Sequence, residues 1–200
     1  SGEMVPMFDV HAPLLSLPNM LGTTLENIPG ATPYLQAPAN DQPLLPPSGK
    51  LKIGIVWRGS ATHRNDHKRS LDLALFNPLF DLDGCDFFSL QMGAGRDQIT
   101  QLGSGPPLHD LAGALIDFAA TATAISELDL LISVDTAVAH LAGALGRPVW
   151  LLLPFAPDWR WMQDRDDSPW YPTMKLFRQK KPGDWAGVFE ELSLELENMT

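Results

Sequence analysis

The sequence predicts an α/β fold with a doubly wound, mostly parallel sheet. From Leu51 onward, short apolar runs alternate with segments of helical spacing. This alternation is typical of βαβ units, in which helices connect parallel strands and cover both faces of the sheet. The 200 residues and the 44% apolar composition suffice for one domain with a full core plus an appendage.

The expected elements follow in chain order and are taken from apolar periodicity and helix-cap signals. Expected strands span residues 51–57, 86–90, 107–111, 130–134, 149–153 and 174–178. Expected helices span residues 71–80, 96–102, 118–127 and 185–198, with one more beginning after Thr136. Pro78 should cut the first of these helices short, because proline has no backbone N–H to donate. Asp117 is a good N-cap for the helix that begins at Phe118.

The opening 48 residues differ from the rest because they are rich in proline, which disfavours long helices and central strands. They also carry apolar side chains such as Phe8, Leu14 and Leu15, too many for a freely solvated tail. We expect residues 1–48 to be the tail of a preceding domain plus a proline-rich hinge, and residues 49–200 to form the α/β domain. The chain starts with Ser1 and not with Met, so we expect a piece of a longer protein.

Charge and composition argue against several classes of protein. A net charge of −10 disfavours nonspecific binding to nucleic acid or to an anionic membrane. No apolar run is long enough for a membrane span, and the first residues are no signal peptide. The single cysteine, Cys85, cannot form an internal disulfide, which fits a reducing compartment. We therefore expect a cytoplasmic protein.

The absence of several sequence motifs argues against further classes of enzyme. The five histidines form no compact set with metal-ligand spacing, so we expect no metal site. There is no Gly-x-Ser-x-Gly elbow, no Gly-x-Gly-x-x-Gly fingerprint and no Walker lysine loop. A hydrolase, a dehydrogenase and a P-loop ATPase are thereby disfavoured.

The most informative feature is the pair Asp135-Thr136, which follows the apolar strand 130–134 and precedes a helix. Open α/β sheets bind ligands at the carboxyl ends of their strands, and a helix N-terminus favours phosphate. His140 lies about one turn into the helix on roughly the same face. These residues predict a diphosphate or nucleotide site. The alternative is that Asp135 and Thr136 only cap the helix and that His140 is a buried core residue.

A basic loop follows the first strand and should face the same edge of the sheet. Gly59 allows close backbone approach, Ser60 supplies a hydroxyl, and four of the chain's fourteen basic residues lie in the loop. These four are Arg58, Arg64, Lys68 and Arg69. In so acidic a protein, this concentration is what a pyrophosphate clamp needs. The alternative is a solvated loop with scattered charges.

An aromatic segment follows the expected strand 149–153. Trp159 and Trp161 flank Arg160, and aromatic faces can stack on a base or a sugar while the guanidinium meets an anion. Packing of this loop onto the core explains the same residues equally well.

Residues 133–148 resemble the nucleotide-sugar motif of the ADP-heptose:lipopolysaccharide heptosyltransferase family, glycosyltransferase family 9. They are still more similar to the glycosyltransferase-like module that follows tetratricopeptide repeats in many bacterial proteins. Segments 54–59, 65–70 and 157–161 resemble the same module, and the resemblance covers about residues 51–178. It implies that residues 49–200 are the Rossmann-like second domain of a GT-B fold, which binds the nucleotide-sugar.

The resemblance also implies roles for individual residues. Asp135, Thr136 and His140 would contact the sugar and the diphosphate. Lys68 or Arg69 would neutralise the leaving phosphate, with Ser60 beside it. Ala137 stands where heptosyltransferases usually have Gly, so its methyl group would border the bound phosphate or sugar. No metal and no cofactor would be needed besides the nucleotide-sugar substrate.

The implied function is the donor-binding half of a metal-independent glycosyltransferase that transfers a sugar to an acceptor hydroxyl. The catalytic carboxylate would lie in the N-terminal domain of the same protein, so we expect no catalytic residue here and little turnover from this chain alone. One alternative is a non-catalytic, transferase-like binding or scaffold module of a repeat protein. Another is an epimerase-like enzyme that binds a nucleotide-sugar. The base, the sugar and the acceptor stay open.

Overall fold

The computed structural model describes residues 7–28, 30–102 and 108–200. The chain divides into two compact units, residues 1–30 and residues 31–200. Among the described residues, no helix is both long and apolar enough to cross a lipid bilayer.

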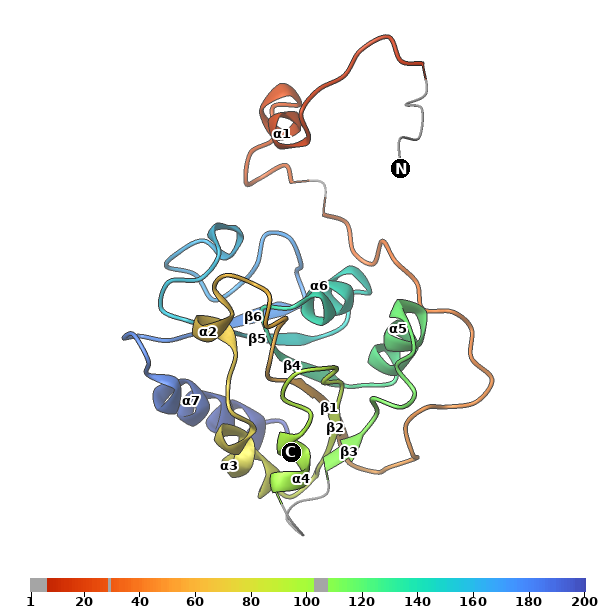
Figure 1. Cartoon of the computed structure of the whole chain (residues 1–200), viewed down its shortest axis with the longest axis vertical. Coiled ribbons are helices and arrows are strands. Elements are labelled where there is room, and N and C mark those ends of the chain that lie inside the picture. The colour runs from red at the N-terminus through yellow and green to blue at the C-terminus, as the bar shows by residue number, and fades with distance from the viewer. Residues whose placement is uncertain (1–6, 29, 103–107) are drawn as a thin grey trace. The chain divides into compact units, whose positions relative to one another are not determined.

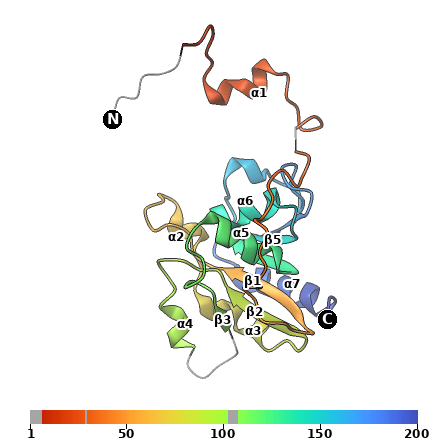
Figure 2. The same cartoon turned by 90° about the vertical axis from the view of Figure 1, so that its right-hand side faces the viewer.

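The larger unit is built on a six-stranded sheet in which every paired strand is parallel. The strands lie in the order β3-β2-β1-β4-β5-β6, the order of a doubly wound fold. They are β1 (Leu51–Val56), β2 (Cys85–Ser89), β3 (Leu108–Asp110), β4 (Leu130–Val134), β5 (Val149–Leu153) and β6 (Met174–Arg178). Figure 2 shows β3, β2 and β1 side by side. The predicted α/β class with a parallel sheet is confirmed.

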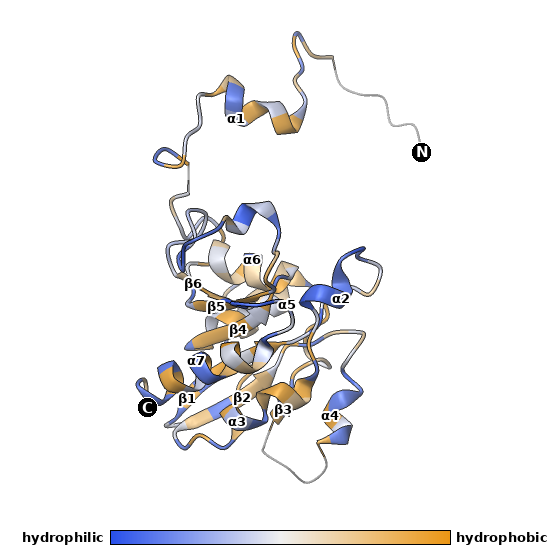
Figure 3. Cartoon of the chain, turned by 90° about the vertical axis from the view of Figure 1, so that its left-hand side faces the viewer, coloured by the Kyte–Doolittle hydropathy of each residue, from blue (hydrophilic) through white to orange (hydrophobic). Residues whose placement is uncertain are grey.

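Helices cover both faces of this sheet and enclose two apolar layers (Figure 1). One layer lies under α5 (Phe118–Ser126) and α6 (Ala137–Ala144). The other lies under η2 (Leu73–Phe76), α3 (Asn77–Phe80) and α7 (Trp185–Glu197). Because successive strand residues point to opposite faces, Ile53 and Ile55 of β1 enter the second layer while Val56 enters the first. Strands buried on both faces are mostly apolar, as Figure 3 shows for β4, in which Ser133 is the one polar residue, and for β5.

Most predicted boundaries agree with the observed ones, and the differences have local causes. The expected helix 71–80 is a 3-10 turn, η2, followed by α3, which restarts at Asn77 because Pro78 fits only in a first helical turn. The expected helix 96–102 is shortened to α4 (Gln98–Gln101). The basic loop ends in a four-residue helix, α2 (Asp66–Arg69), which was not predicted. Pro107, expected to start β3, lies outside the described residues.

Within the larger unit, residues 31–50 are joined to the helices of the α/β fold by backbone hydrogen bonds. The N–H groups of Tyr34 and Leu35 both donate to the carbonyl oxygen of Ala144. The N–H groups of Leu44 and Leu45 donate to the carboxylate of Glu127, at 3.0 and 2.8 Å. Part of the segment that we assigned to a hinge is therefore attached to the α/β domain.

The smaller unit contains η1 (Leu14–Ser16) and α1 (Leu17–Met20). None of its described residues is buried, and Leu14 and Leu15 are largely exposed. Residues 1–6 and 29 of the expected tail and hinge lie outside the described residues.

The N-cap of α5 gives a direct test of local helix stability. The Asp117 carboxylate accepts a hydrogen bond of 2.7 Å from the N–H of Ala120, which confirms the predicted cap. Asp117→Ala should lower the free energy of unfolding by about 1 kcal/mol, because this N–H loses its acceptor. Urea denaturation measures the change. Asp117→Asn, which keeps an oxygen acceptor, serves as the matched control, and equal losses in both variants would contradict the capping role.

Candidate functional site

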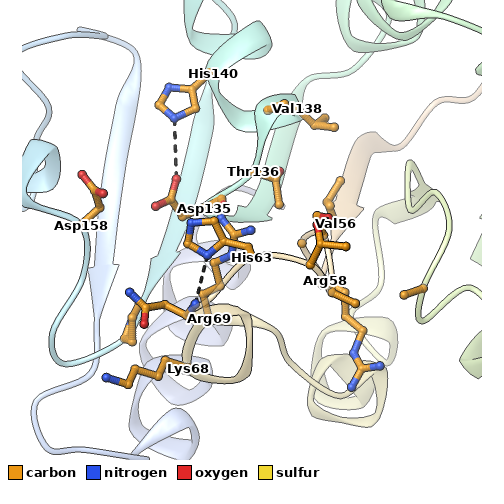
Figure 4. A pocket seen from close by; sticks show the side chains of 18 of the residues that line it. Val56, Arg58, His63, Lys68, Arg69, Asp135, Thr136, Val138, His140 and Asp158 are labelled. Carbon is orange, nitrogen blue, oxygen red and sulfur yellow. Dashed lines mark hydrogen bonds and ion pairs between the residues drawn. The ribbon is translucent and has the colours of Figure 1, made fainter.

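A pocket of about 920 Å³ opens at the carboxyl edge of the sheet. It lies where the strand order reverses, between β1 and β4, the place where doubly wound sheets bind ligands. Loops after β1, β2, β4 and β5 all contribute to its wall (Figure 4). Of the predicted site residues, those that line it are Arg58, Gly59, Ser60, Lys68, Arg69, Asp135, Thr136, Ala137 and His140.

The N-terminus of α6 faces this pocket without a side-chain cap. Thr136 occupies the N-cap position, but its hydroxyl lies 3.2 Å from the hydroxyl of Ser133 and caps no N–H. The N–H groups of Ala137 and Val138 find no acceptor within the described part of the chain. Unpaired N–H groups at a helix N-terminus carry partial positive charge and bind anions. The alternative in which the Thr136 side chain only caps the helix is therefore not supported.

Asp135 presents a carboxylate beside this helix end. Its side chain is 14% exposed, and Oδ1 lies 3.6 Å from Nε2 of His140. Burial favours a raised pKa for Asp135, but interactions with His140, the indole of Trp161 and the charge of Arg69 outweigh it and hold the pKa below the usual 3.8. The buried Trp161 N–H has no partner of ordinary hydrogen-bond geometry among the described residues, yet its proximity helps to lower the pKa of this carboxylate. Asp135 is therefore ionised and can accept hydrogen bonds from a ligand.

His140 is held in place by two aromatic neighbours. Its Nδ1 lies 3.1 Å from the hydroxyl of Tyr171, and its ring stacks on Trp161 at 5.2 Å between centroids. Burial raises the pKa of the Tyr171 hydroxyl, which stays protonated and can donate to Nδ1. A donor at Nδ1 leaves the proton of neutral His140 on Nε2, the nitrogen that faces Asp135.

Arg69 connects the loop after β1 to the loop after β4. Its Nη1 donates to the carbonyl oxygen of Asp135 at 2.6 Å, and its Nε lies 3.4 Å from a carboxylate oxygen of Asp66. The same Asp66 oxygen accepts from the hydroxyl of Ser70, which accepts from the N–H of Gly59. A Cβ at Gly59 would lie 2.6 Å from Nη2 of Arg69, so a side chain there would displace the guanidinium. Two of the three guanidinium nitrogens are thus engaged within the protein.

Lys68 is a basic side chain of the pocket for which the described residues provide no ion pair. It is exposed, lines the pocket, and has no carboxylate within ion-pair distance in the described chain. Arg58 has less freedom, because its Nε donates to the carbonyl oxygen of Leu71 at 3.3 Å. The hydroxyls of Ser60 and Thr62 lie 2.8 Å apart on the same wall.

The aromatic segment after β5 differs from expectation. Its 3-10 turn, η3 (Trp159–Trp161), turns successive side chains in different directions. Trp161 is fully buried, and Trp159 is 70% exposed but packs edge-on against Trp170 outside the pocket wall. Neither ring lies where we expected it to stack on a ligand. Arg160 between them does line the pocket and pairs with Asp158 at 2.8 Å.

Several residues of the wall were not predicted. His63, Asn65 and Asp158 line the pocket from the loops after β1 and β5. Gln91, two residues after the end of β2, is 2% exposed, and its side-chain amide makes five hydrogen-bond contacts. Its signal in the sequence is a polar residue immediately after an apolar run, the same signal as Asp135 after β4. Among the described residues, no three His, Cys, Asp or Glu side chains are grouped so as to hold a metal ion.

Comparison with known proteins points to one family. Residues 96–152 match the sequence model of glycosyltransferase family 9 (heptosyltransferase). This segment runs from α4 nearly to the end of β5 and includes Asp135, Thr136 and His140. The match indicates a glycosyltransferase-like domain around the pocket.

Two similar proteins cover more of the chain. Protein FlbA of Caulobacter vibrioides is 28% identical over 154 residues, which are 74% of this chain and 25% of FlbA. The chain thus spans a quarter of the length of this relative. A solved glycosyl transferase of family 9 from Veillonella parvula is 16% identical, with 73% of this chain and 39% of that chain covered at a TM-score of 0.48.

The lowered pKa of Asp135 makes stability depend on pH. A carboxyl whose pKa is lower in the folded state stabilises the fold above its unfolded-state pKa, and this contribution is lost as the pH falls through the folded-state pKa. At neutral pH, Asp135→Asn should be less stable than the wild type by about 1 kcal/mol. The difference should shrink as the pH falls below 3.8, the usual value for this group. Urea denaturation across this range measures it, and a difference that does not vary with pH would contradict the assignment.

Proposed function

We propose that the pocket binds a nucleotide diphosphate sugar and forms the donor half of a metal-independent glycosyltransferase. The observation that carries this proposal is the uncapped N-terminus of α6, which faces a large pocket beside an ionised Asp135 and a free Lys68. Cationic and carboxylate groups in one pocket suit a ligand that combines a diphosphate with a hydroxyl-rich sugar. The match of residues 96–152 to glycosyltransferase family 9 supports the same reading.

In this proposal the diphosphate is held by donors that need no metal. The N–H groups of Ala137 and Val138 and the ammonium of Lys68 meet the phosphate oxygens, and the hydroxyl of Ser60 lies on the same wall. During transfer, the bond between the anomeric carbon and the phosphate oxygen breaks, and negative charge grows on the departing diphosphate. Preorganised donors stabilise that charge where it develops.

The sugar is recognised by hydrogen-bond acceptors that line the same pocket. The carboxylates of Asp135 and Asp158 can accept hydrogen bonds from sugar hydroxyls, and Arg160 holds Asp158 at the pocket wall. Of the two basic residues that the sequence left open, we assign the leaving phosphate to Lys68. Arg69 is engaged by Asp66 and by the carbonyl oxygen of Asp135, so it positions the two loops.

The proposal also covers the acceptor side of the reaction, which we place in a longer protein. The acceptor hydroxyl attacks the anomeric carbon and gives its proton to a base, for which we propose a carboxylate of a preceding N-terminal domain. A bacterial protein with tetratricopeptide repeats upstream is the arrangement that we favour. The isolated chain would then bind donor but turn it over little.

Nucleotide binding tests this proposal most directly. We expect ADP, UDP or GDP, or one of their sugars, to raise the melting temperature of the chain, because binding to the folded state stabilises it. Lys68→Ala should weaken affinity for that nucleotide by roughly tenfold or more, since a charge-assisted contact is lost. Lys180→Ala is the matched control, because this lysine is 81% exposed and lies outside the pocket.

Two results would count against a donor site. One is the absence of a thermal shift with all three nucleotides and their sugars at millimolar concentration, which would favour the non-catalytic scaffold alternative. The other is an equal effect of Lys68→Ala and Lys180→Ala, which would mean that the phosphate does not meet Lys68.

A further inference from the structure

The side-chain amide of Gln91 joins the loop after β1 to the loop after β2. Its Oε1 accepts from the backbone N–H groups of Trp57 and Arg58, at 3.1 and 2.9 Å. Its Nε2 lies within hydrogen-bond distance of the carbonyl oxygens of Arg58, Met92 and Ala94, at 3.2, 3.0 and 3.0 Å, and its two hydrogens are shared among these three acceptors. All the hydrogen-bonding capacity of one buried amide is thus used on the backbone of two loops.

These two loops make up much of one wall of the pocket, and they also pack directly against each other. Gly93 and Gly95 have φ values of +64° and +90°, which allow residues 91–95 to turn back over the Gln91 amide. A Cβ on Gly95 would lie 2.5 Å from Cδ of Arg58, so the glycine lets the loops approach closely. In the loop after β1, Arg58, Gly59 and Ser60 come directly after Trp57 and line the pocket.

We propose that Gln91 is a positioning residue, which holds the two loops in the shape that the ligand requires. Without its amide, two backbone N–H groups and three carbonyl oxygens lose their partners at the base of the loops. A glutamate would oppose its charge to the three carbonyls, and an apolar side chain of equal length would satisfy none of the five groups. The effect on affinity rests on the proposed nucleotide site, but the effect on the loops does not.

Gln98 provides a matched control in the same region. Its Oε1 accepts from Nε1 of Trp57 and from the N–H of Leu73, at 2.9 and 3.0 Å, and its Nε2 donates to Asp72. It is a partly buried amide that also anchors the segment after β1, yet it does not line the pocket. Gln98→Met therefore controls for the loss of an amide that anchors the same segment without lining the pocket.

The experiment compares these two variants in the whole 200-residue chain. Backbone amide hydrogen exchange by NMR reports on the loops without any ligand. Calorimetric titration with ADP, UDP and GDP, each in turn and well below the melting temperature, reports on affinity. In Gln91→Met, exchange at the N–H groups of Trp57 and Arg58 should rise by at least about tenfold, and the Kd for the nucleotide that binds should rise by at least about tenfold. In Gln98→Met, both quantities should stay within about threefold of the wild type.

Two results would overturn the inference: unchanged exchange at Trp57 and Arg58 in Gln91→Met, or an unchanged Kd despite faster exchange. If the wild type binds none of the three nucleotides, the proposed function fails, whereas the exchange data still decide whether Gln91 holds the loops. Should Gln91→Met not fold, Gln91→Asn keeps an amide that is one methylene too short to reach both loops. It should show the same two changes, and wild-type values in that variant would also overturn the inference.

Discussion

The pairing of β1 with β4 is the interaction on which the pocket depends. β1 pairs with β2 on one side and with β4 on the other, with Val56 opposite Ser133 at the last step of the β1–β4 ladder. Connections that leave these two strands run in opposite directions and leave a crevice between them. The basic loop and the Asp135-Thr136 pair, which are far apart in the chain, therefore emerge next to each other. Both strands are buried on both faces, so neither can shift without disturbing two apolar layers.

Most polar groups at the carboxyl edge of the sheet form hydrogen bonds within the protein, and these hydrogen bonds fix the shape of the site. Gln91 joins the loops after β1 and β2 by hydrogen bonds, and Arg69 joins the loops after β1 and β4 in the same way. The groups that face the pocket without a partner among the described residues include the first N–H groups of α6 and the ammonium of Lys68. Groups held in position before a ligand arrives need little reorganisation when charge develops on it. The arrangement therefore suits the stabilisation of a departing diphosphate better than a flexible basic loop would.

Aromatic side chains near the site hold His140 in position. Trp161 and Tyr171 pack around His140 and fix the direction in which its ring faces Asp135. Sequence reasoning treated the two tryptophans of the turn as equivalent, since both flank Arg160. Only the direction in which a 3-10 turn points its side chains separates the buried ring from the exposed one. The buried ring of Trp161 belongs to the apolar layer that also contains Leu151 of β5 and Leu176 of β6, so its burial depends on contacts outside the turn.

The sequence by itself determined the α/β class, most strand positions, the N-cap at Asp117, and the placement of two polar segments at one edge of the sheet. These properties depend on apolar periodicity and on cap preferences, which act over a few residues. The tertiary structure alone decided that Arg69 is engaged while Lys68 has no ion pair among the described residues, and that Gln91 joins two loops. Such roles depend on distances between side chains tens of residues apart. Those distances follow from strand order and register, which no local pattern in a single sequence specifies.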